Sequence, residues 1–117
     1  MEQAKKEMLA AAGIDAEDAL ERFMGSEALL TRFLGRFLED ASMDALRGAV
    51  AVGDWDKALT ASHTLKGMCG NLSMTVLYDL FTRQVALLRA SDTAGAAALM
   101  PAIEAACRKA AAAIREL

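Results

Sequence analysis

Residues 54–72 read Asp-Trp-Asp-Lys-Ala-Leu-Thr-Ala-Ser-His-Thr-Leu-Lys-Gly-Met-Cys-Gly-Asn-Leu, and their periodicity predicts one amphipathic helix. Its apolar side chains gather on one side of the helical wheel: Ala58, Ala61, Leu65, Met68, Cys69 and Leu72. His63, the only histidine in 117 residues, falls on the other side when residues advance by about 100° each. We therefore expect its imidazole to face solvent and the apolar stripe to face a helical core.

The helix face around His63 is predicted to hold five further residues: Leu59, Thr60, Lys66, Gly67 and Gly70. Glycine inside a helix costs roughly 1 kcal/mol relative to alanine, so two on one face call for an explanation. Missing side chains beside an exposed histidine leave an open patch over which another protein's active site could close. Gly70 equally fits a frayed helix end, whereas the apolar stripe continues past Gly67.

Lys66 adds a positive charge one turn after His63. A phosphoryl group on an imidazole carries close to two negative charges, and a nearby ammonium offsets them. A solitary histidine has no second imidazole as its base or as a joint metal ligand. An exposed His with Lys at i+3 and Gly at i+4 therefore indicates a histidine that carries a phosphoryl group.

Turn signals divide the rest of the chain into further helices. Residues 2–11 form a helical pattern ending near Gly13, and Asp15 is predicted to cap a short helix to about Met24. A longer pattern opens at Ser26 and runs to Gly53, and it is compatible with a kink near residues 40–42.

Similar turn and cap residues divide the second half of the chain into helices. Asp54 is predicted to cap the helix of His63, and Ser73 the helix after it. Ser91 and Asp92 close that helix and open the last one, in which Pro101 indicates a local break. We expect an all-α fold: an antiparallel four-helix bundle with one or more short N-terminal accessory helices, in a single domain over 1–117 with its bundle core at about 26–117.

Composition narrows the classes of function. The chain is 55% hydrophobic with a net charge of −3 and no basic run, which argues against nucleic acid as a partner. It has neither an apolar run long enough to span a bilayer nor a signal-peptide pattern, so we expect a cytoplasmic protein without a membrane partner. Cys69 and Cys107 fit reduced thiols better than a disulfide. The initial Met and the complete bundle pattern favour a free-standing protein over a piece of a kinase.

Residues 62–67, Ser-His-Thr-Leu-Lys-Gly, resemble the His-x-x-Lys-Gly signature of histidine-containing phosphotransfer (HPt) domains. Residues 53–58 are similar to the family's lead-in to its active-site helix, and the resemblance covers about residues 13–115. It implies phosphorylation of His63 at Nε2, with Lys66 stabilising the phosphoryl group and Gly67 leaving room for the partner. The implied partners are response-regulator receiver domains and a hybrid histidine kinase. The chain would be a phosphoryl carrier, not an enzyme by itself, with no cofactor or metal of its own and Mg²⁺ in the receiver.

The sequence departs from the family in two places. Where many members have Gly after the motif, this chain has Asn-Leu-Ser-Met at 71–74. Some members use a polar residue on the following helix to hold the imidazole. Gln84 is the candidate for that supporting role here, with Val85 as the alternative one position on.

Three other interpretations compete with a phosphoryl carrier. An HPt-like binding module would dock on a receiver or kinase and inhibit or sequester it without turnover. A soft-metal site using His63, Cys69 and methionines is disfavoured because the wheel places Cys69 about 120° from His63. An independent enzyme is disfavoured because no nucleotide loop, nucleophile–base pair or carboxylate pair is visible.

Overall fold

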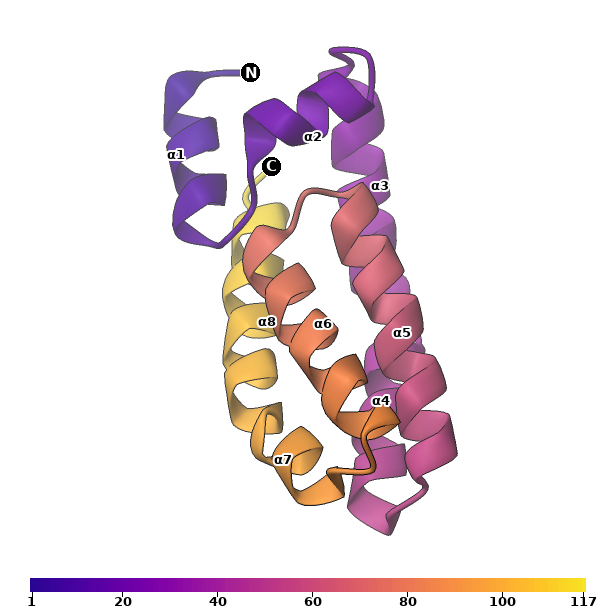
Figure 1. The fold of residues 1–117 in the computed structure, drawn as a ribbon. Coiled ribbons are helices and arrows are strands. Elements are labelled where there is room, and N and C mark those ends of the chain that lie inside the picture. The colour runs from indigo at the N-terminus through magenta and orange to yellow at the C-terminus, as the bar shows by residue number, and fades with distance from the viewer.

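The computed structural model describes all 117 residues as helices joined by short turns (Figure 1). In chain order they are α1 (Gln3–Ala11), α2 (Ala16–Arg22), α3 (Glu27–Glu39), α4 (Ser42–Val52), α5 (Trp55–Asn71), α6 (Thr75–Arg89), α7 (Thr93–Ala98) and α8 (Met100–Arg115). Helix α5 packs against α4 and α6, and α8 packs against α6 and α3. With α3 and α4 forming one side, α5 and α8 lie diagonally across an antiparallel four-helix bundle. The predicted all-α class and bundle are confirmed.

Helix α1 and helix α2 cover the end of the bundle where α5 turns into α6 (Figure 1). The side chains of Leu9, Ala16 and Ala19 are buried there and join the core of the bundle. The accessory helices thus close one end of the hydrophobic interior, beside the last turns of the helix that carries His63. None of the helices combines the length and the hydrophobicity needed to cross a bilayer.

Side-chain caps set the starts of four of the eight helices. The residues Asp15, Ser26, Asp54 and Asp92 each accept a hydrogen bond from the backbone amide three positions on, as the sequence predicted. The prediction for Ser73 is wrong. The cap position of α6 is Met74, without a side-chain cap bond, and the Ser73 hydroxyl instead donates to Asp18 Oδ2 at 2.6 Å.

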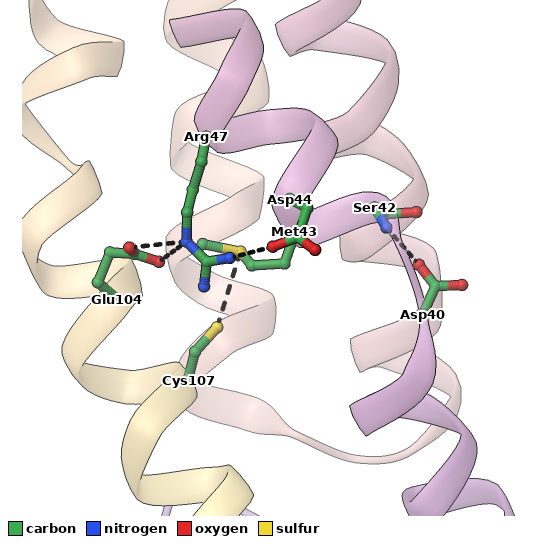
Figure 2. Close-up of polar contacts among 7 residues, drawn as sticks. All are labelled: Asp40, Ser42, Met43, Asp44, Arg47, Glu104 and Cys107. Atoms are coloured by element: carbon green, nitrogen blue, oxygen red, sulfur yellow. Dashed lines mark hydrogen bonds and ion pairs between the residues drawn. The ribbon is translucent and has the colours of Figure 1, made fainter. Parts of the chain in front are cut away.

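The long N-terminal element is broken between α3 and α4, where a kink had been compatible with the sequence. Asp40 Oδ1 accepts a hydrogen bond from the Ser42 amide at 2.7 Å, which opens α4 (Figure 2). Arg47 then ties α4 to α8, because its Nε lies 2.9 and 2.8 Å from the two carboxylate oxygens of Glu104. Its Nη1 also donates to Asp44 at 2.6 Å. The paired bonds to Glu104 link α4 to α8, and Asp44 on α4 orients the guanidinium.

Both cysteines are free thiols. Cys69 is buried in the core, and Cys107 is half-buried with its Sγ 3.9 Å from Met43 Sδ (Figure 2). Burial raises the pKa of Cys107 to about 11 and raises that of Cys69 further. Both groups are therefore protonated and poorly nucleophilic near neutral pH.

Candidate functional site

His63 lies near the middle of α5 on its outer face, and its side chain is exposed. Of the predicted apolar stripe, Met68 is half-buried and the other members are buried, which confirms the predicted amphipathic pattern. The imidazole forms no hydrogen bond or ion pair with another residue of the chain. Both ring nitrogens are therefore free to react or to bind a partner.

An open cleft of about 440 Å³ runs beside the imidazole, between α5, α2 and the start of α6. Its lining includes His63, Lys66, Gly67, Gly70, Tyr78, Asp18 and Arg22. Three residues of the predicted patch thus share one hollow with His63. The α2 residues are an addition that the sequence did not predict.

The two glycines of the patch have different structural roles. A Cβ atom placed on Gly67 would meet no atom within 4 Å, so the surface there is open. A Cβ atom on Gly70 would lie 3.2 Å from the ring of Tyr78. Gly70 therefore makes room for an aromatic side chain of α6 and is half-buried, whereas only Gly67 presents bare backbone to a partner.

The other predicted residues of the patch differ in how far they reach solvent. The Lys66 ammonium forms no ion pair within the chain, so its charge is available to an incoming anion. Thr60 is exposed, and its hydroxyl donates to the Asp56 carbonyl at 3.2 Å. Leu59 is half-buried against the core and offers only part of its surface.

Gln84 is buried and holds helices together. Its Oε1 accepts a hydrogen bond from the Ser62 hydroxyl at 2.8 Å, and its Nε2 donates to the Ala96 carbonyl at 3.1 Å. The same Nε2 lies 3.2 Å from Met100 Sδ. Gln84 therefore bonds to the residue before His63 and not to the imidazole, which corrects the supporting role predicted from the sequence. Val85, the alternative, is also buried.

Asp18 links α2 to the turn before α6. Its Oδ2 accepts hydrogen bonds from the Ser73 hydroxyl at 2.6 Å and from Arg22 Nε at 3.0 Å. The Ser73 bond, followed by the Arg22 bond, lowers the pKa of the Asp18 carboxyl. Spacing of i and i+4 hints at the Asp18–Arg22 pair in the sequence. Nothing local reveals Ser73, which lies 55 residues away.

Asp18→Asn should lower the melting temperature slightly at pH 7, because the ionised carboxylate is better stabilised in the folded than in the unfolded chain. A lowered folded pKa gives stability that is present above the unfolded value of about 3.9 and is lost as the pH falls through the folded value. Melting curves of both proteins from pH 7 down to pH 2 should therefore converge at the acid end. The effect is small because the Asp18 and Arg22 side chains are each about half-exposed, so solvent screens their interaction. A constant difference at every pH would contradict this assignment.

Comparison with known proteins gives one result. The family model described as Hpt domain matches residues 28–116, which is more than half of the chain. No match was found among curated proteins or among solved structures. The matched range contains His63 and Lys66 and starts after helix α2 has ended.

Proposed function

Because the chain belongs to the Hpt domain family, we propose that it carries a phosphoryl group on His63 in a multistep His–Asp phosphorelay. Membership places the chain among phosphotransfer domains of two-component signalling. The single observation that supports the role of His63 is its setting: an exposed imidazole without partners, beside an unpaired ammonium and the bare backbone of Gly67. We propose receiver domains and a hybrid histidine kinase as partners, in the cytoplasm.

In the proposed reaction, a receiver domain presents the acyl phosphate of its aspartate to His63. The neutral imidazole attacks phosphorus in line through Nε2, the N–P bond forms, and the bond from phosphorus to the aspartate oxygen breaks. The aspartate leaves as a carboxylate, and the Lys66 ammonium offsets the charge of the phosphoryl group on His63. The reverse sequence delivers the group to a second receiver.

Such a transfer depends mainly on positioning and on charge stabilisation. We propose that the receiver supplies the acidic residues and the Mg²⁺, so that this chain acts as a carrier and needs no cofactor of its own. The cleft beside His63 is open, which suits a partner that binds briefly and leaves.

A direct test follows the label. A receiver domain of the source organism is phosphorylated with labelled acetyl phosphate, freed of the donor and mixed with the chain. We expect the label to move to the chain in a form that is labile to acid and stable to base, as phosphohistidine is. A receiver that binds the chain while keeping its label would instead support the binding module that inhibits or sequesters.

Gly67→Gln should slow transfer from the receiver by about tenfold or more, because a side chain would stand where the partner approaches and small misplacements are costly. Gly35→Gln in α3 is the matched control, since a Cβ atom there also meets no atom within 4 Å. Both changes should raise helix stability by a similar amount, up to about 1 kcal/mol. The measurement is kcat/KM for transfer in both variants. Equal rates would remove the steric role of Gly67.

A further inference from the structure

Helix α2 brings a second cation to the cleft beside His63. The side chain of Arg22 is 51% exposed and lines the cleft together with His63 and Lys66. Its Nε is occupied by Asp18 at 3.0 Å, but its two Nη groups donate to no residue of the chain. The two Nη groups of the guanidinium are therefore available to bind a carboxylate or a phosphate.

Helix α2, which carries this guanidinium, is anchored by contacts between the α1–α2 turn and the residues that lead from α5 into α6. The Asp15 amide donates to the Ser73 carbonyl at 2.9 Å, and the Thr75 hydroxyl donates to the Gly13 carbonyl at 3.2 Å. A Cβ atom on Gly13 would lie 2.7 Å from Val76, so the α1–α2 turn touches the start of α6.

Ser73 itself adopts a left-handed conformation, with φ at 53°. That conformation is unfavourable for a residue that has a Cβ atom. It persists because the carbonyl of Ser73 binds Asp15 while its hydroxyl binds Asp18. Helix α2 is thus fixed relative to the end of α5, and Arg22 keeps its place at the edge of the cleft.

The two cations of the cleft differ in what surrounds them. Lys66 has no carboxylate partner, whereas Arg22 shares its charge with Asp18. Lys66 therefore stabilises a dianionic phosphoryl group on His63 more than Arg22 does. The carboxylate of Asp18 repels that phosphoryl group and opposes its close approach to Arg22. A singly charged carboxylate on a partner surface meets less of this repulsion than a dianionic phosphoryl group, and it can accept hydrogen bonds from the free Nη groups.

We propose that Arg22 is a docking residue that binds a carboxylate on the receiver, next to the aspartate that exchanges the phosphoryl group with His63. This inference rests on the proposed function. It assigns to α2, which lies outside the matched family range, a part in choosing the partner. Pairing of a rim charge with an opposite charge acts mainly on the association rate and weakens with salt.

The test compares wild type with Arg22→Ala, using transfer from a phosphorylated receiver at low and at high salt. We expect kcat/KM to fall by about tenfold at low ionic strength, and the difference to shrink in 0.5 M salt, where the Debye length is only a few ångströms. Phosphorylation of His63 by phosphoramidate, a small donor without a docking surface, should proceed at the wild-type rate. Arg108→Ala in α8, diagonal to α5, is the matched control and should leave both reactions unchanged.

Each other outcome separates the claims. Equal kcat/KM in wild type and Arg22→Ala overturns the docking role. Equal losses with the receiver and with phosphoramidate overturn it as well and place Arg22 on the phosphoryl group. Absence of phosphohistidine with both donors refutes the proposed function. In that event the dissociation constant of the unphosphorylated receiver, compared between wild type and Arg22→Ala, still decides the role of Arg22.

Discussion

His63→Gln is expected to abolish acceptance of the phosphoryl group and to leave the free energy of unfolding within about 0.5 kcal/mol of wild type. The amide of glutamine has no nucleophilic ring nitrogen, so no N–P bond forms. The fold should tolerate the change because the imidazole is exposed and bonds to nothing in the chain. The measurements are transfer of label from a receiver and thermal melting by circular dichroism.

Thr64→Gln places the same new side chain one residue further along α5, where the native threonine is also exposed. It should keep acceptance of the label, so a loss confined to His63→Gln points to the imidazole itself. Label on the His63→Gln protein would assign the reaction to another residue. Unfolding of that variant would contradict the exposed position of His63.

Gln84→Leu should lower the free energy of unfolding by about 2–3 kcal/mol, although leucine has nearly the volume of glutamine. The cost comes from the buried Ser62 hydroxyl, which loses its partner, and from the Ala96 carbonyl, which keeps only the 3.3 Å bond from the Leu99 amide. Urea unfolding measures the change.

Two further variants sharpen this prediction. The double change Ser62→Ala with Gln84→Leu should recover part of the loss, since both ends of the buried bond are then apolar. Gln3→Leu on the exposed face of α1 is the matched control and should stay within about 0.5 kcal/mol of wild type. A Gln84→Leu protein as stable as wild type would mean that the buried bond contributes nothing.

Those features of this molecule that depend on neighbours in sequence could be predicted. Caps such as Asp15 and Asp54 act on amides three residues away, so they fix helix starts from local spacing. The same holds for the face shared by His63, Lys66 and Gly67, because a helix turns the order of residues directly into geometry.

What escaped prediction depends on residues that are distant in sequence. Serine is a residue type that commonly caps helices, but the Ser73 hydroxyl donates its hydrogen bond to Asp18 instead. Gln84 was expected at the imidazole, but the pairing of α5 with α6 brings it to Ser62. Arg22 reaches the cleft only because the two turns at that end of the bundle bind each other. Helical spacing contains no information about any of these contacts between residues that are distant in sequence.

The open backbone over Gly67 has a consequence for how partners are told apart. A surface made of main-chain atoms offers the same hydrogen-bonding groups to every partner, so it discriminates little between related receivers. Selectivity among receivers must then come from side chains at the edge of this surface, such as Thr60 and Arg22. These side chains can be exchanged without altering the phosphoryl transfer itself. We expect exchanges confined to that edge to redirect the chain to a different receiver while the proposed phosphorylation of His63 stays intact.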